Sequence, residues 1–228
     1  MNIAIIPARG GSKRIPRKNI KEFLGKPIIA YSIEAAIKSN LFDQVIVSTD
    51  DLEVAQVAKI YGAEVPFMRP SELSDDYTGT NDVVKHALNW FLEQGISVEY
   101  ACCIYATVPF LRVQYLQDGL EQLQRHNKSF AFSVTSYPSP VQRAMMIKQN
   151  GVTMLYPEHS NTRSQDLEET YHDAGQFYWG RAESFLNNEK LFSQLSFPVI
   201  IPRELVQDID TIEDWNQAKL IYKILQHE

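Results

Sequence analysis

The sequence predicts a doubly wound α/β fold, in which helices cover both faces of a mostly parallel β-sheet. Short apolar runs without alternation, such as residues 2–7, are typical of strands buried on both faces. Segments with helical periodicity separate these runs, as crossover connections between parallel strands require. The 228 residues are 44% hydrophobic and 22% charged, which is typical of a globular protein with a full core.

Strands and helices alternate through the first 135 residues. Pro27 suits the start of a helix, and Asp50 and Thr80 are expected N-caps, because their side-chain oxygens accept from free backbone N–H groups. Gly62 and Gly95 follow the expected ends of two helices. The predicted strands are 2–7, 44–48, 65–68, 100–105 and 129–135, and the predicted helices are 28–38, 50–61, 80–94 and 113–125.

The alternation of strands and helices stops between residues 137 and 171, where prolines interrupt it. The Asn150-Gly151 pair predicts a β-hairpin of residues 145–147 and 152–155. We therefore expect a single domain over residues 1–228, from which residues 137–170 protrude as an arm. Regular structure resumes at residues 176–179 and 197–201, and a last helix is predicted over 211–225.

A basic, glycine-bearing loop follows the first predicted strand. Gly10 and Gly11 let backbone N–H groups approach an anion, and Ser12 adds a hydroxyl donor. Ligands of open α/β sheets bind outside the carboxyl ends of the strands, so we expect this loop to bind nucleotide phosphates. A solvated basic surface loop is the alternative. Five of the 22 basic residues fall within ten positions here: Arg9, Lys13, Arg14, Arg17 and Lys18.

Two carboxylates precede the last predicted helix. In an extended segment, Asp208 and Asp210 point to the same face, as Mg²⁺ requires when it also binds a substrate phosphate. The alternative is helix capping by Asp210 or Thr211, with Thr211 and Asp214 as a capping box. Capping accounts for only one of the two carboxylates, so we favour a magnesium site.

Two further polar segments are candidates for ligand contacts. Arg69, in the loop that leads to Thr80, can pair with a phosphate or a carboxylate. Asp173 could orient the neighbouring His172. Ordinary loop polarity explains either segment equally well. The second segment holds a dense polar set that suits a sugar pocket: Arg163, Gln165, His172, Asp173 and Gln176.

Composition excludes several classes of function. The formal net charge of −6 gives no general reason to bind nucleic acid. No apolar run approaches the roughly 20 residues that span a bilayer. The adjacent Cys102 and Cys103 cannot join distant segments and are interpreted as buried hydrophobic residues in a reducing compartment. We therefore expect a cytoplasmic protein without nucleic-acid or membrane partners.

Several motifs occur in a fixed order along the chain. They are Ile5-Ile-Pro-Ala-Arg-Gly-Gly-Ser-Lys13, Pro16 with Lys18-Asn19, Val47-Ser-Thr-Asp50, Arg69-Pro70 and Asp208-Ile-Asp210. This ordered set resembles the cytidylyltransferases that activate nonulosonic (sialic-type) acids with CTP. Residues 101–112 depart from the pattern of the N-acetylneuraminate enzymes, since Tyr105 and Val108 replace a glutamine and a serine. The form Tyr-Ala-Thr-x-Pro-Phe, with residues 161–167 and 171–179, is similar to the pseudaminic acid cytidylyltransferases.

The resemblance implies a Rossmann-like nucleotidyltransferase fold and a Mg²⁺-dependent reaction of CTP with pseudaminic acid, which yields CMP-pseudaminic acid and pyrophosphate for surface or flagellar glycans. It implies a homodimer whose arm reaches the partner's site. With the candidates above, it implies catalytic Lys13, Asp208 and Asp210, the two aspartates also binding the metal. The implied CTP-binding residues are Ala8, Arg9, Gly10, Gly11, Ser12, Lys18, Asn19, Arg69, Thr80 and Thr107, and the sugar-binding residues are Tyr105, Arg163, Gln165, His172, Asp173 and Gln176.

Two alternatives stay open at this point. Another sugar acid, such as N-acetylneuraminate, legionaminate or an octulosonate, would change only the pocket around Tyr105 and Arg163. A non-catalytic nucleotide or sugar sensor on the same fold is the more distant alternative, because a fold does not fix a function.

Overall fold

A six-stranded sheet forms the centre of the protein in a computed structural model that describes residues 1–226. The strand order is β10-β6-β9-β5-β1-β4, and β9 alone runs antiparallel to its neighbours. The expected mostly parallel sheet is therefore confirmed, with one reversed strand near its middle. The strands are β1 (Asn2–Pro7), β4 (Gln44–Ser48), β5 (Tyr100–Ile104), β6 (Phe130–Ser136), β9 (Tyr171–Arg181) and β10 (Ser196–Ile200).

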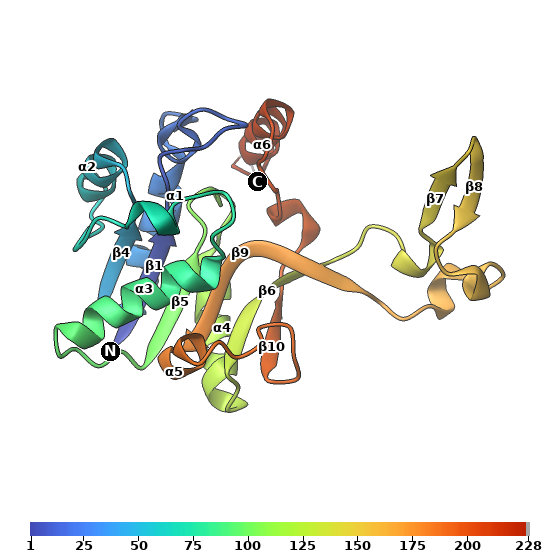
Figure 1. Cartoon of the computed structure of the whole chain (residues 1–228). Coiled ribbons are helices and arrows are strands. Elements are labelled where there is room, and N and C mark those ends of the chain that lie inside the picture. The colour runs from blue at the N-terminus through green and yellow to red at the C-terminus, as the bar shows by residue number, and fades with distance from the viewer. Residues whose placement is uncertain (227–228) are drawn as a thin grey trace.

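Helices cover both faces of this sheet (Figure 1). One hydrophobic core lies between the sheet and α1, α2, α4 and α6, and a second lies under α3 and α5. In α4, Leu116, Leu120 and Leu123 recur at helical spacing and are buried, which explains why this polar segment forms a helix. The helices are α1 (Ile28–Ser39), α2 (Leu52–Ile60), α3 (Thr80–Glu93), α4 (Val113–Arg125), α5 (Ala182–Leu186) and α6 (Ile212–Leu225).

Successive residues of each central strand enter different cores. Cys102 packs in the core under α1 and α4, whereas Cys103 packs in the core under α3. Both cysteines are free and buried, as the sequence predicted. This alternation explains the continuous apolar runs, because a strand covered by helices on both faces needs apolar side chains at every position.

The segment 65–68 is not a strand, contrary to prediction. It follows an isolated parallel bridge between Ile46 and Glu64, where Val47 N–H donates to the Glu64 carbonyl (2.8 Å). Pro66 has no N–H group with which to continue a ladder. The chain instead passes along the edge of β4 until Arg69 N–H donates to Thr49 (2.8 Å).

Two predicted helix caps are displaced by one residue. Asp51, not Asp50, caps α2 by accepting from Val54 N–H. Gly79 occupies the N-cap position of α3, and Thr80 is its first helical residue. At α6 the capping box that was the alternative to the magnesium site is present: Thr211 accepts from Asp214 N–H, and the Asp214 carboxylate accepts from Thr211 N–H.

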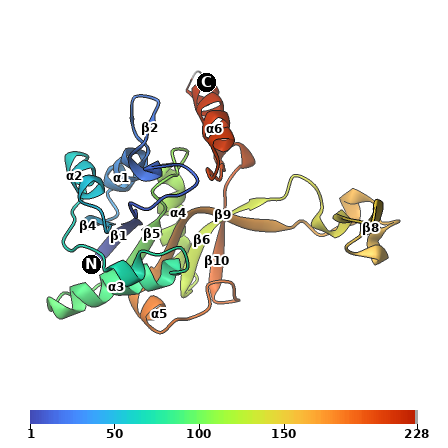
Figure 2. The same cartoon turned by 45° about the horizontal axis from the view of Figure 1, so that its top comes forward.

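Residues 137–170 leave the sheet between β6 and β9 and extend away from the body, as both views show (Figures 1 and 2). They contain the predicted hairpin, as β7 (Met145–Lys148) and β8 (Gly151–Met154). Its turn is Gln149-Asn150, both with positive φ, one residue before the predicted pair. Ile147 and Val152 are exposed on it.

The connections at the carboxyl edge of the sheet lead to the candidate site. The loop after β1 contains the short strands β2 (Glu22–Phe23) and β3 (Lys26–Pro27) before α1. The start of β9 reaches the same edge because that strand is reversed. No helix within residues 1–226 is long and apolar enough to cross a membrane. The part of the chain that the structure describes also contains six 3₁₀ helices: η1 (Lys18–Ile20), η2 (Ser71–Leu73), η3 (Val141–Arg143), η4 (Pro157–His159), η5 (Ser164–Asp166) and η6 (Arg203–Leu205).

Candidate functional site

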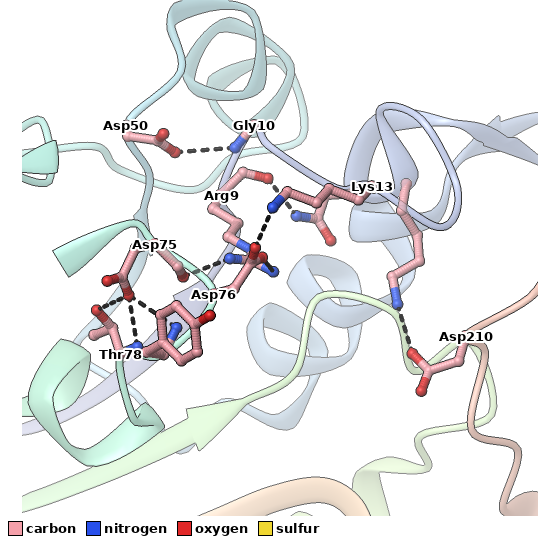
Figure 3. Close-up of polar contacts among 11 residues, drawn as sticks. Arg9, Gly10, Lys13, Asp50, Asp75, Asp76, Thr78 and Asp210 are labelled. Atoms are coloured by element: carbon pink, nitrogen blue, oxygen red, sulfur yellow. Dashed lines mark hydrogen bonds and ion pairs between the residues drawn. The ribbon is translucent and has the colours of Figure 1, made fainter. Parts of the chain in front are cut away.

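A basic loop after β1 lies at the carboxyl edge of the sheet. Ala8 N–H donates to Ser48 and extends the β1–β4 pairing by one residue, so the loop leaves from a fixed position. Gly10 N–H then donates to the Asp50 carboxylate (2.9 Å), and Asn19 Nδ2 donates to the Arg9 carbonyl (2.9 Å) (Figure 3). These contacts shape the loop before any ligand arrives.

The loop forms one wall of a cavity of about 350 Å³. Residues from α3, from the loop before α3 and from the loop after β5 form the opposite wall. Most of the residues expected to bind CTP meet here, although they are far apart in the sequence. Those lining the cavity are Arg9, Ser12, Lys13, Lys18, Asn19, Arg69, Thr80 and Thr107, together with Tyr105 from the expected sugar site.

The remaining expected CTP residues, Ala8, Gly10 and Gly11, do not line this cavity. Ala8 is fully buried under the loop. Gly10 has no room for a side chain, since a Cβ atom there would lie 2.6 Å from Oδ2 of Asp51. A Cβ atom on Gly11 would meet nothing within 4 Å.

Acidic residues hold the cations of the loop. Arg9 and Lys13 both contact Asp76, from the loop that precedes α3. On the other side, Arg14 lies 2.8 Å from Oδ2 of Asp210 and Lys18 lies 3.3 Å from its Oδ1. The loop is thus charge-paired at both ends. The sequence did not single out Asp76, although its loop was a candidate for ligand contacts.

Arg69 is 5% exposed, and its guanidinium lies beside this cavity. Nε donates to Ser74 Oγ (3.1 Å). Burial lowers the pKa of Arg69, an effect that the nearby Asp50 charge opposes and the Arg9 charge increases. A buried cation at a cavity wall is stabilised by an anionic ligand, because such a ligand replaces the solvation lost on burial.

A second cavity of about 390 Å³ shares Tyr105 and Thr107 with the first. His172 and Asp173, from the start of β9, form part of its wall, and Asp208 forms another part. Three residues expected to act on the sugar therefore border a space next to the basic cavity. Asp208, expected to bind the metal, faces that same space.

The two aspartates differ in their surroundings. Asp210 is ion-paired with Arg14 and Lys18, whereas Asp208 has no ion-pair partner within residues 1–226. Desolvation, followed by the negative charge of Asp210, raises the pKa of Asp208. Among the described residues, no three His, Cys, Asp or Glu side chains gather as a metal site. The two carboxylates of Asp208 and Asp210 fit Mg²⁺, which is commonly bound by one or two carboxylates together with water and substrate phosphates.

Hydrogen bonds connect the two cavities. Tyr105 OH and Thr80 Oγ1 are 3.1 Å apart. Asp173 does not orient the His172 ring through its carboxylate: that group accepts from Gly175 N–H (2.8 Å) and Tyr178 OH (2.7 Å). The ring of His172 instead donates to the Asp173 carbonyl (2.9 Å). Tyr178 is not among the expected site residues, because it lies within an apolar strand segment.

Three expected sugar residues do not border either cavity. Gln176 is 2% exposed, and its Nε2 donates to the Leu205 carbonyl (2.6 Å), so it supports the wall from behind. Arg163 and Gln165 lie in the protruding arm, next to and within η5. Within one chain, the arm carries these two residues away from the site.

Known proteins are similar to this chain over its whole length. The sequence profile of a family described as "Cytidylyltransferase" matches residues 3–222. A pseudaminic acid cytidylyltransferase of Campylobacter jejuni is 46% identical over 228 residues, which cover 100% of this chain and 98% of that protein. A CMP-N,N'-diacetyllegionaminic acid synthase of Legionella pneumophila is 30% identical, over 98% of this chain and 97% of that protein.

A solved structure supports the same relationship at the level of the fold. CMP:2-keto-3-deoxy-manno-octonic acid synthetase, solved in complex with CTP, matches with a TM-score of 0.72. The two chains are 16% identical, and the match covers 100% of this chain and 99% of the other.

Proposed function

The chain belongs to the cytidylyltransferase family, and from this premise we propose that it activates pseudaminic acid with CTP, giving CMP-pseudaminic acid and pyrophosphate. The observation that carries the proposal is the meeting of Arg9, Lys13, Lys18 and Arg69 around one cavity in a chain of net charge −6. A cavity of that charge at the carboxyl edge of an α/β sheet suits a nucleoside triphosphate.

In the proposed reaction, the anomeric hydroxyl of the sugar acid attacks the α-phosphorus of CTP, and pyrophosphate leaves in line. Negative charge grows on phosphoryl oxygens as the bond to the leaving group breaks. Arg9, Lys13 and Lys18, with the backbone of residues 10–12, hold the triphosphate and stabilise this charge. Catalysis then depends mainly on positioning and charge neutralisation.

We assign Asp208 and Asp210 to Mg²⁺. The bound ion would neutralise the phosphates further. Arg14 and Lys18 pair with Asp210 and hold its side chain beside the basic loop. A carboxylate oxygen of Asp208 or Asp210 would accept the proton of the attacking hydroxyl.

The sugar acid is assigned to the second cavity, beside Tyr105, His172 and Asp173. Its own carboxylate would be bound by Arg163, because a planar guanidinium binds a carboxylate through two parallel hydrogen bonds. Arg163 lies in the arm, so we propose a homodimer in which the arm of one protomer reaches the site of its partner. We place the reaction in the cytoplasm, where CTP is available.

The test supplies the purified protein with CTP, Mg²⁺ and, separately, pseudaminic, legionaminic, N-acetylneuraminic and octulosonic acids. Pyrophosphate release and the mass of the nucleotide sugar are measured together. Product with pseudaminic acid alone supports both the reaction and the substrate. If another acid is preferred, the proposed reaction stands, but the assignment of Tyr105 and residues 163–176 to a pseudaminic acid pocket is wrong. Binding of CTP without turnover with any acid would favour a sensor.

A further inference from the structure

Asp76 contacts two cations of the basic loop after β1, which we call the phosphate loop (residues 9–18), from the opposite wall of the cavity. Its Oδ1 lies 2.7 Å from Nη2 of Arg9, and its Oδ2 lies 2.5 Å from Nζ of Lys13 (Figure 3). A carboxylate held by an arginine and a lysine uses the same donors that a phosphate group would use. Asp76 therefore stands where an anionic part of a ligand would bind.

The loop around Asp76 is built to present this carboxylate. Oδ1 of the preceding Asp75 accepts from Tyr77 N–H (2.9 Å), Thr78 N–H (2.7 Å) and Thr78 Oγ1 (2.6 Å). Arg9 also donates to the Asp75 carbonyl. The turn is thereby fixed from within, while the side chain of Asp76 points at the cations.

Asp76 can leave the cations without disturbing a core. Its side chain is 38% exposed and the following Tyr77 is 94% exposed. Ion pairs at such exposed positions contribute little to stability and exchange readily with other anions. A triphosphate carries several negative charges and would repel the carboxylate at this range.

We propose that Asp76 is an internal competitor for the phosphate site: its carboxylate occupies Arg9 and Lys13 in the free protein, yields them to the incoming triphosphate, and rebinds them as pyrophosphate leaves. The proposal rests on the assignment of the phosphates to these two cations. It makes Asp76 a residue that weakens binding of substrate and product alike. Loss of its charge should therefore tighten both, whereas a residue that only orients the cations would have the opposite effect.

The first experiment measures pyrophosphate binding by calorimetry in metal-free buffer, without sugar acid and without turnover. We expect Asp76→Asn to bind pyrophosphate about three- to tenfold more tightly than the unmodified protein, as the loss of one or two exposed ion pairs allows. The matched control is Glu72→Gln, which changes net charge equally in the same loop. Glu72 is exposed and contacts Ser71 rather than a cation of the site.

Three results would overturn the proposal. They are unchanged or weaker binding by the Asp76 variant, equal tightening by the Glu72 control, and no pyrophosphate binding by any of the three proteins at millimolar concentration. A thermal melt of each variant checks that the fold is retained.

A kinetic experiment separates this proposal from the proposed function. In the turnover assay, the KM for CTP and the inhibition constant of pyrophosphate should fall by a similar factor in Asp76→Asn, while the KM for the sugar acid stays constant. A rise in the KM for CTP would overturn the proposal that Asp76 competes with the triphosphate. If no sugar acid is turned over but the variant still binds pyrophosphate more tightly, the proposed reaction is wrong and the proposed role of Asp76 stands.

Discussion

The guanidinium of Arg17 binds both carboxylate oxygens of Asp51: Nη1 lies 2.5 Å from Oδ2, and Nη2 lies 2.9 Å from Oδ1. Arg17, next to the last basic residue of the loop after β1, adopts a left-handed conformation (φ 56°), and Asp51 caps α2. The Gly10 backbone packs against the same Asp51 side chain. One carboxylate thus fixes both ends of the loop to the first turn of a helix.

This pairing predicts a stability effect that depends on pH. Arg17 holds the pKa of Asp51 at about 2, against an ordinary 3.8. A lowered pKa means that the ion pair contributes above pH 3.8 and loses its contribution as the pH falls toward 2. Asp51→Asn keeps a capping oxygen but removes the charge, and we expect a loss of about 1 kcal/mol near neutral pH.

Urea unfolding of both proteins between pH 7 and pH 3 measures the effect. The difference in the free energy of unfolding should shrink toward the acid end. A difference that stays constant with pH would show that the carboxylate acts as a cap alone.

Gly10 and Gly11 offer a matched pair of substitutions. Gly10→Ala would place Cβ 2.6 Å from the Asp51 carboxylate, so the loop must shift, at a cost of about 1–3 kcal/mol. Gly11→Ala meets open space. We expect the first variant to lose CTP affinity and melt at a lower temperature, and the second to change little. Equal effects would show that backbone freedom, not space, sets the requirement.

Asp208 can be tested against a nearby carboxylate outside the site. We expect Asp208→Ala to lower turnover by about 10²–10³-fold, the usual effect of removing an electrostatic group from a transition state. Chelation of Mg²⁺ should abolish turnover of the unmodified protein. Glu204, exposed on η6, supplies the control Glu204→Gln. Pyrophosphate release assays report both, and near-normal release by a folded Asp208 variant would contradict the metal assignment.

Tyr105 lies where the two cavities meet. Tyr105→Phe removes the hydrogen bond to Thr80 and the only polar atom of the side chain. We expect the KM for the sugar acid to rise by about two- to tenfold, the value of one hydrogen bond, with a smaller change for CTP. Steady-state kinetics with each substrate varied in turn measures the split. A rise in the KM for CTP alone would assign Tyr105 to the nucleotide site instead.

The arm provides a test of the proposed homodimer. Ile147 on β7 is 84% exposed, and Ile147→Glu would place a charge at any contact that covers it. We expect the dissociation constant of the dimer to rise at least about tenfold, which corresponds to about 1.4 kcal/mol. Ile60→Glu on α2 is the control, since Ile60 is 77% exposed on the body. Light scattering across a dilution series reports both, and a monomeric unmodified protein would contradict the dimer.

Local sequence signals determined most of the elements. Apolar runs without alternation predicted β1, β4 and β5, because a strand covered on both faces needs apolar residues throughout. Helical spacing predicted α1, α3 and α4, and Thr211 with Asp214 predicted the cap of α6. The basic residues after β1 predicted a ligand site at the carboxyl edge of the sheet, and a cavity lined by basic side chains lies there.

Other features depended on contacts between distant segments. Pro66, at the edge of β4, prevents residues 65–68 from pairing as a strand. Asp51 is the cap of α2, and its side chain also contacts Arg17 and lies against Gly10. The reversal of β9 brought His172 and Asp173 beside Asp208.

The sequence by itself determined the alternation of elements, the basic loop and the acidic pair, since these follow from short-range periodicity and local charge. The tertiary structure alone decided which polar side chains pair. Asp76 is 63 residues from Lys13, and Tyr178 meets Asp173 only through the bend of β9. Ion pairs and hydrogen bonds of this kind form between side chains that folding brings together, and no fixed spacing in the sequence marks their partners.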